Sequence, residues 1–165
     1  MSVLHFAPEK SLKKVLANQP HLRYITTDLC EPTDVNMDIT RLAIPNDTFD
    51  AILCSHVLEH IPDDAAAMRE LHRVLKPNGL AILQVPLDMQ REHTYEDFSI
   101  TDPAERRKHF GQEDHVRMYG RDYKTRLQAA GFQVNVDSYV KTLGPDKAKR
   151  YGLMEEDLYL CTKLA

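Results

Sequence analysis

The sequence predicts an α/β fold: a mainly parallel sheet between two layers of helices, a three-layer α/β/α arrangement whose last strand is antiparallel. Strand patterns and helix patterns alternate along the chain, which is typical of βαβ units. Residues 80–85 are almost all apolar, as expected of a strand covered by helices on both faces. The last two predicted strands, 132–139 and 158–162, have a short connection, so we expect them to pair antiparallel. A single domain over 1–165 accommodates all these elements.

The first half of the chain supplies four of the predicted strands. Residues 3–7 form a short strand, and Pro8 then opens a helix at a position that proline favours. A second strand covers 22–27 and a shorter third strand covers 35–38. The apolar run 49–55 is the fourth strand, and it is bounded on both sides by polar turn residues.

The middle of the chain is dominated by a helix that begins at residues 62–64, Pro-Asp-Asp. Its apolar residues recur at helical spacing up to Leu75. We expect this helix to end at residues 77–79, Pro-Asn-Gly, because proline and glycine together stop helices. A further helix is predicted over 121–130, just before the last two strands.

The segment 87–119 breaks the alternating pattern. It is polar, rich in His, Asp, Glu and Arg, and too long for a plain connection. Segments of this length without regular structure are usually functional lids or disordered. We expect a lid over the ligand site, whose candidate substrate contacts are His93, Tyr95, His115 and Arg117.

Composition limits the classes of partner. Charged residues make up 28% of the chain and hydrophobic residues 42%, a usual balance for a soluble protein. The net charge of −4 gives no attraction for a polyanion, so we expect no nucleic-acid partner. No apolar run approaches the roughly 18 residues of a membrane span, and the first residues lack a signal-peptide pattern. Three cysteines without a CxxC pair suit reduced thiols, so we expect a cytoplasmic protein with no membrane partner.

The most informative motif joins the fourth strand to the next helix. In open α/β sheets, ligands bind beyond the carboxyl ends of the strands, where this polar turn lies. Residues 55–64, SHVLEHIPDD, and 69–86, RELHRVLKPNGLAILQVP, resemble the centre of small class I S-adenosylmethionine-dependent methyltransferases of the type 11 family. The first turn, LHFAPE at 4–9, resembles that of one subgroup of this family.

This resemblance implies a Rossmann-like sheet of order 3-2-1-4-5-7-6 and S-adenosyl-L-methionine as the cofactor. On the same resemblance, Asp28 binds the ribose hydroxyls and Asp38 accepts from the adenine amine, while the N–H of Ile39 donates to the ring. Asp28 also lies about 20 residues past the first turn, where dinucleotide folds place their ribose carboxylate. The full set of expected cofactor contacts is His5, Phe6, Ala7, Glu9, Asp28, Leu29, Asp38, Ile39, Ser55, His56 and Val57.

The first turn departs from the family because it contains no glycine. A dinucleotide site needs glycines for close approach to the pyrophosphate, so the turn argues against a nucleotide-dependent oxidoreductase. S-adenosylmethionine has no phosphate, and a helix N-terminus at Pro8 can attract its carboxylate. We expect Glu9 to pair with its ammonium group.

The histidines after the fourth strand allow two interpretations. Residues 56–60 spell H-x-x-E-H, a zinc-protease pattern, but that pattern needs a continuous helix. Here a strand precedes it and Pro62 follows, so we expect no metal. His56 and His60 lie nearest the expected reaction centre and are the candidate general bases.

We therefore expect a methyltransferase that acts on a small-molecule acceptor by direct displacement at the sulfonium methyl group. The alternative is a catalytically inactive protein of the same fold that binds S-adenosylmethionine or S-adenosylhomocysteine, or serves as an interaction protein. The glycine-free turn favours this alternative, as does the expected absence of the N-terminal cap that precedes the first strand in relatives. An uncapped pocket also favours a homo-oligomer in which a second copy covers the mouth.

Overall fold

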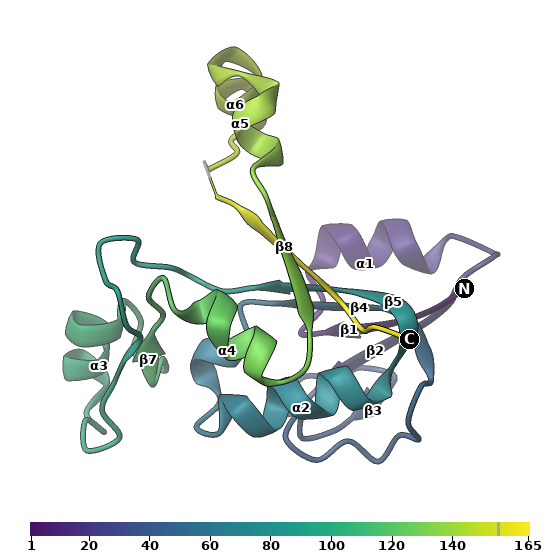
Figure 1. The fold of residues 1–165 in the computed structure, drawn as a ribbon, viewed down its shortest axis with the longest axis horizontal. Helices are drawn as coiled ribbons and strands as arrows, with labels where there is room; N and C mark the ends of the chain where they lie inside the picture. The colour runs from purple at the N-terminus through teal and green to yellow at the C-terminus, as the bar shows by residue number, and fades with distance from the viewer. Residues whose placement is uncertain (155) are drawn as a thin grey trace.

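Seven strands form the central sheet: β1 (Ser2–Phe6), β2 (Arg23–Asp28), β3 (Val35–Asn36), β4 (Phe49–Ser55), β5 (Leu75–Gln84), β8 (Gln133–Asp137) and β9 (Leu158–Thr162). They lie in the order β3-β2-β1-β4-β5-β9-β8 in this computed structural model, which describes residues 1–154 and 156–165 (Figure 1). The first five strands in that order pair in parallel, and β9 is antiparallel to both of its neighbours. The predicted fold class and strand order are confirmed.

Helices cover the two faces of the sheet unequally. Figure 1 shows α1 (Lys10–Ala17) on one side of the sheet, and α2 (Asp64–Val74) and α4 (Tyr123–Ala129) on the other. The main core lies between the sheet and α2, which contributes Met68, Leu71 and Val74 with at most 1% exposure. No residue of α1 is buried. The layer formed by α1 therefore contributes no fully buried side chain to the core.

The start of α2 follows the predicted signal, but its end does not. The Asp63 carboxylate accepts a hydrogen bond from the Ala66 N–H at 2.8 Å and caps the helix. The helix ends at Val74, and Leu75 already has the extended backbone of β5, where it pairs with Phe49. The predicted end at 77–79 was therefore wrong. Leu75 is fully buried in the strand, and an apolar residue is equally expected on the buried face of a helix, so its apolar character did not distinguish the two.

The segment 87–119 is more regular than predicted. It contains β6 (Tyr95–Glu96), α3 (Pro103–Phe110) and β7 (Arg117–Met118), and β6 and β7 form a small antiparallel sheet. These elements lie together at one end of the main sheet (Figure 1). Helix α3 buries only Phe110, so the apolar periodicity that reveals most helices is missing from its sequence.

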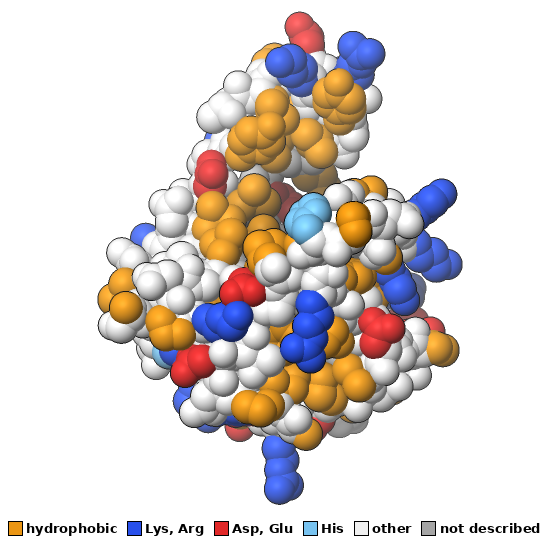
Figure 2. All heavy atoms as spheres, turned by 90° about the vertical axis from the view of Figure 1, so that its right-hand side faces the viewer, with side chains coloured by type: hydrophobic (Ala, Val, Ile, Leu, Met, Phe, Trp, Pro, Cys, Tyr) orange, Lys and Arg blue, Asp and Glu red, His pale blue; other side chains and the backbone are white. Residues whose placement is uncertain are grey.

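The connection between β8 and β9 forms a projecting lobe. Strand β8 ends at Asp137, two residues before the predicted limit, and the chain continues into α5 (Tyr139–Leu143) and α6 (Pro145–Tyr151). Figure 2 shows hydrophobic side chains on the surface of this lobe. Among the described residues, no helix combines the length and the apolar character that crossing a membrane requires.

Candidate functional site

A cavity of about 390 Å³ opens beyond the carboxyl ends of β1, β2 and β4. Parallel strands end at the same edge of a sheet, so the turns that follow them surround one hollow. Its volume lies within the range of small-molecule sites. The cavity is lined by Phe6, Ala7, Asp28, Leu29, Cys30, Met37, Asp38, Ile39, His56, Val57, His60, Ile61 and Asp114.

Two of the strand ends bend sharply through a left-handed residue. Ala7 follows β1 with φ 43°, and His56 follows β4 with φ 53°. The Ala7 N–H donates to the Thr27 carbonyl and the His56 N–H donates to the Gln84 carbonyl, each at 2.9 Å. Side chains with a Cβ rarely adopt this conformation, and strained residues cluster at functional sites. The first turn thus adopts a glycine-type conformation without a glycine.

Asp28 presents a carboxylate to the cavity from the end of β2. Its Oδ1 accepts from the N–H groups of Cys30 at 2.8 Å and Glu31 at 2.9 Å, which fixes the turn. Its Oδ2 has no hydrogen-bond partner among the described residues. One oxygen therefore shapes the loop, while the other is free to accept from a ligand.

Asp38 is arranged in the same way. Its Oδ1 accepts from the side chain of Thr40 at 2.7 Å and from the Thr40 N–H at 2.8 Å. These hydrogen bonds, the side-chain one first, lower the pKa of Asp38 below its ordinary value, so the group is ionised at neutral pH. The neighbouring Ile39 is buried and lines the cavity.

Three expected cofactor contacts do not line the cavity: His5, Glu9 and Ser55. His5 is fully buried, and its Nε2 lies 2.8 Å from Glu9 Oε2 while its Nδ1 lies 2.7 Å from the Tyr24 hydroxyl. Burial lowers the pKa of His5, and desolvation raises the pKa of Tyr24 to about 12. Glu9 therefore braces the first turn through His5, and its pairing with an ammonium group stays a prediction.

The two candidate bases both reach the cavity. The His56 side chain is half exposed, and its Nδ1 lies 3.4 Å from Oε1 of the buried Glu59. His60 lies in the 3₁₀ turn η1 (Leu58–His60), and its Nδ1 lies 3.2 Å from Asp114 Oδ2. No sequence signal pointed to Asp114 as a lining residue, because it lies in the polar segment 87–119, whose folding was not predicted.

The four candidate substrate contacts lie outside the cavity lining. His93 is exposed, Tyr95 places its hydroxyl 3.3 Å from His109 Nδ1, and His115 is buried. Arg117 is also buried.

The guanidinium of Arg117 is held entirely by protein groups. It donates to Glu96 at 2.9 Å and to the carbonyls of Leu58, Ile61 and Pro62. Arg117 therefore anchors β7 to the turn after β4, and the structure argues against its predicted contact with substrate.

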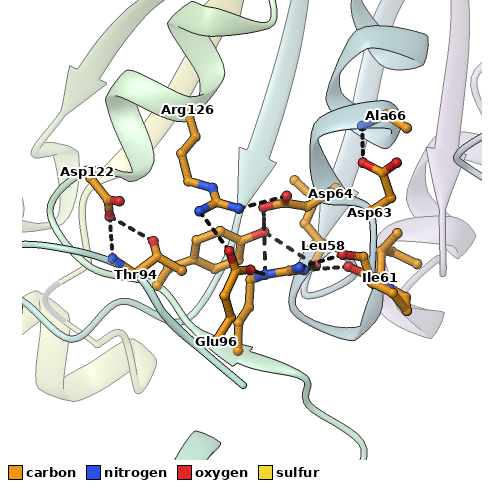
Figure 3. A network of polar contacts seen from close by, with 12 residues as sticks. Leu58, Ile61, Asp63, Asp64, Ala66, Thr94, Glu96, Asp122 and Arg126 are labelled. Atoms are coloured by element: carbon orange, nitrogen blue, oxygen red, sulfur yellow. Dashed lines mark hydrogen bonds and ion pairs between the residues drawn. The ribbon is translucent and has the colours of Figure 1, made fainter. Parts of the chain in front are cut away.

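A second arginine extends this anchor. Figure 3 shows Arg126 of α4 bridging Asp64 and Glu96, at 2.9 Å and 3.5 Å. Asp64 also accepts from the hydroxyl of Tyr119 at 2.7 Å, and burial together with this carboxylate raises the pKa of Tyr119. The network joins α2, α4 and the segment 87–119 behind the cavity.

The family of the chain follows from its sequence match. A family model described as "Methyltransferase domain" matches residues 8–136, which is most of the chain. The chain belongs to the methyltransferase domain family. The predicted recognition is confirmed at this level, while the subgroup defined by the first turn stays a prediction.

Curated relatives of this methyltransferase domain cover parts of it. The ubiquinone/menaquinone biosynthesis C-methyltransferase UbiE of Escherichia coli O1:K1 / APEC is 28% identical over 123 residues, 67% of this chain and 49% of the relative. The demethylmenaquinone methyltransferase of Chlamydia muridarum is 41% identical over 49 residues, 29% of this chain and 21% of that protein. The chain thus spans about half the length of the first of these relatives.

Solved structures share the fold over almost the whole chain. The putative methyltransferase in a complex with the Haloferax volcanii Trm112 activator has a TM-score of 0.68 at 14% identity, covering 99% of this chain and 83% of that one. A putative methyltransferase from Bacillus halodurans has a TM-score of 0.63 at 16% identity, with 99% and 92% coverage. At these identities, the likeness concerns the fold alone.

The cofactor of the family, S-adenosyl-L-methionine, fits the cavity. Its adenosine carries hydroxyls and an amine, and Asp28 and Asp38 each offer one unused carboxylate oxygen at the cavity wall. Its lack of a phosphate agrees with a first turn that contains no glycine. The predicted cofactor is confirmed at the level of the family.

Proposed function

We propose that this methyltransferase domain binds S-adenosylmethionine beyond β1, β2 and β4 and transfers its methyl group to a small-molecule acceptor. The observation that carries the proposal is the pair Asp28 and Asp38, two carboxylates with one unused oxygen each on the wall of one cavity. Hydroxyl and amine donors satisfy such oxygens, and a charge-assisted hydrogen bond is stronger than a neutral one.

In the proposed complex, Asp28 accepts from the ribose hydroxyls and Asp38 from the adenine amine. Phe6, Ile39 and Val57 supply apolar walls for the ring and the ribose. The N–H groups of the first turn and of α1 favour the carboxylate at the amino acid end. When bound, the cofactor supplies an electrophilic methyl group on its sulfonium. The chain's main contribution is positioning, because holding two reactants in line removes most of the entropic barrier.

His56 is the better placed of the two candidate bases. Its ring is half exposed at the cavity, and Glu59 lies beside one ring nitrogen, at 3.4 Å. The other ring nitrogen then faces an acceptor that loses a proton as it attacks. His60 is paired with Asp114 and is less free to act in this way.

The segment 87–119 forms the wall at the acceptor end in this proposal, since Asp114 lines the cavity. The net charge of −4 favours a small-molecule acceptor over a nucleic acid. The relatives are methyltransferases of ubiquinone and menaquinone biosynthesis and of demethylmenaquinone, so quinone precursors are the first acceptors to examine.

Calorimetric titration with S-adenosylhomocysteine tests the cofactor site. The variants Asp28→Asn and Asp38→Asn keep the oxygen that holds each turn and replace the unused oxygen with an amide donor. Losing a charge-assisted bond of about 1.5–3 kcal/mol weakens binding about 10- to 100-fold. Asp146→Asn, on the exposed surface of α6, is the matched control and leaves binding unchanged. Absence of binding by the wild-type chain refutes the proposal.

Turnover distinguishes an enzyme from a binding protein. The wild-type chain is incubated with methyl-labelled S-adenosylmethionine and an acceptor panel that includes demethylmenaquinone. Label in an acceptor, reduced in His56→Gln, supports catalysis. Binding of S-adenosylhomocysteine without turnover on any acceptor favours the alternative, an inactive binding protein of the same fold.

A further inference from the structure

A cluster of three polar side chains, two of them buried, lies at the cavity wall. It consists of Glu59 and His60 from η1 and His115 from the stretch before β7. One ligand atom from each lies within 4.8 Å of the other two. The backbone fixes this juxtaposition, because the Val116 N–H donates to the Glu59 carbonyl at 2.9 Å.

Glu59 is a buried carboxylate without a hydrogen bond. It is 1% exposed, and neither side-chain oxygen has a hydrogen-bond partner in the part of the chain that the structure describes. Burying an unpaired carboxylate is costly, and buried charges in proteins are paired or bind metals. The nearest ring nitrogens, His56 Nδ1 at 3.4 Å and His115 Nε2 at 4.0 Å, make no hydrogen bond to it.

His115 presents a second unsatisfied atom to the same point. Its Nδ1 lies 3.0 Å from the Phe110 carbonyl, which can only accept, so Nδ1 carries the proton. In the neutral ring, the buried Nε2 is then an acceptor, and it faces Glu59 without a partner. A cation bound between these two acceptors, which face one another across 4.0 Å, would satisfy both of them.

The spacing favours a metal ion over a direct contact. A charge-assisted N–H···O bond measures about 2.7–2.9 Å, much shorter than the observed separation. Two ligands on one tetrahedral zinc ion, with bonds of about 2.0–2.2 Å, lie roughly 3.4 Å apart. A small inward shift of either side chain reaches that spacing.

His60 completes the set and has the support typical of a metal ligand. Its Nδ1 lies 3.2 Å from Asp114 Oδ2, and carboxylates that hold one ring nitrogen orient the other toward a metal. The His115 contact with the Phe110 carbonyl is of the same kind. The His60 side chain is 31% exposed and lines the cavity, so an ion can enter from that side.

We propose that Glu59, His60 and His115 bind a divalent transition metal ion, with zinc as the best match to two imidazoles and one carboxylate. Three protein ligands leave a tetrahedral ion one position for water or another small ligand. The site departs from the sequence-based expectation of no metal. That expectation considered a helical pair made by His56 and His60, whereas the structure pairs His60 with a residue from a distant segment.

Zinc titration of the chelator-stripped, full-length chain tests the site. Calorimetry is expected to show one tight binding event, and zinc is expected to raise the Tm. Cobalt(II), used as a spectroscopic probe, is expected to give visible absorption bands of a low-coordinate ion. Glu59→Gln and His60→Ala each reduce zinc affinity at least tenfold and abolish the Tm shift. His109→Ala, on α3 and outside the cluster, is the matched control for binding by the other histidines and changes neither.

Either of two results overturns the inference: no zinc binding by the wild-type chain, or equal binding by Glu59→Gln, His60→Ala and wild type. Glu59→Gln also removes a buried charge, so its stability without zinc is measured as well; a Tm shift that persists in this variant counts against the site. A parallel titration with S-adenosylhomocysteine in EDTA separates this inference from the proposed function. Intact product binding without zinc binding refutes the metal site alone, and the reverse result refutes the cofactor site alone.

Discussion

Replacing Ala7 with glycine is expected to stabilise the chain. Ala7 ends β1 in the left-handed region at φ 43°, where the Cβ of an L-residue costs about 1–2 kcal/mol. Glycine removes this strain but gains freedom in the unfolded chain, which returns about 0.4–1 kcal/mol. Ala7 is exposed, so no core cavity results from the lost methyl group. The net gain is about 0.5–1 kcal/mol, or a Tm increase of about 1–4 °C for a chain of this size.

The measurement is denaturant unfolding followed by circular dichroism, since the chain has no tryptophan. Ala65→Gly, at an exposed position of α2, is the matched control and is expected to lose about 0.5–1 kcal/mol. Ala7 also lines the cavity. We nevertheless expect Ala7→Gly to keep its affinity for S-adenosylhomocysteine. If Ala7→Gly loses as much stability as the control, the left-handed conformation of the first turn is refuted.

Three further predictions concern the rest of the chain. Arg117→Ala removes a charged donor from Glu96 and from the carbonyls of Leu58, Ile61 and Pro62, and is expected to destabilise the fold by about 3–5 kcal/mol in denaturant unfolding, far more than Arg126→Ala; equal losses would contradict the anchoring role. Burial first, then Lys163, lowers the pKa of His72 below 6.5, so its contribution to stability is full above pH 6.5 and is lost as the pH falls below it. Stability measured from pH 7.5 to 5.5 should therefore fall less in His72→Gln than in wild type. Cys30 is exposed and the other two cysteines are buried, so a thiol reagent should modify one group in the native chain and three in denaturant.

The sheet was predictable because its signals are local. The alternation of strand and helix patterns predicted its strands, and the resemblance to class I methyltransferases predicted their order. The end of α2 was not predictable, because Leu75 is equally apolar on a helix face and in a strand. The bounds of helix α3 were not predictable, since the helix exposes nearly all of its residues to solvent.

The candidate site was predictable where a residue sits at a strand end. Eight of the expected contacts line the cavity, among them Asp28, Asp38 and His56. Glu9 is absent from the lining and contacts His5 of β1, and sequence does not reveal where a buried ring turns; the cofactor contact of Glu9 stays a prediction. The proximity of Glu59 and His115 was not predictable either, since it depends on how the long polar segment 87–119 folds against the turn after β4.

The segment 87–119 is held to the rest of the chain by contacts near its ends. Leu87 bridges to Tyr119 and the Asp88 N–H donates to the Tyr119 carbonyl, which joins the two ends of the segment, and Arg117, two residues before Tyr119, binds the turn after β4. Freeing that buried arginine would cost about 3–5 kcal/mol, so a hinge at the base would open in fewer than about one molecule in a hundred. With this segment held in place, we expect molecules to reach the cavity beside His60, and we expect the width of that opening to limit their size.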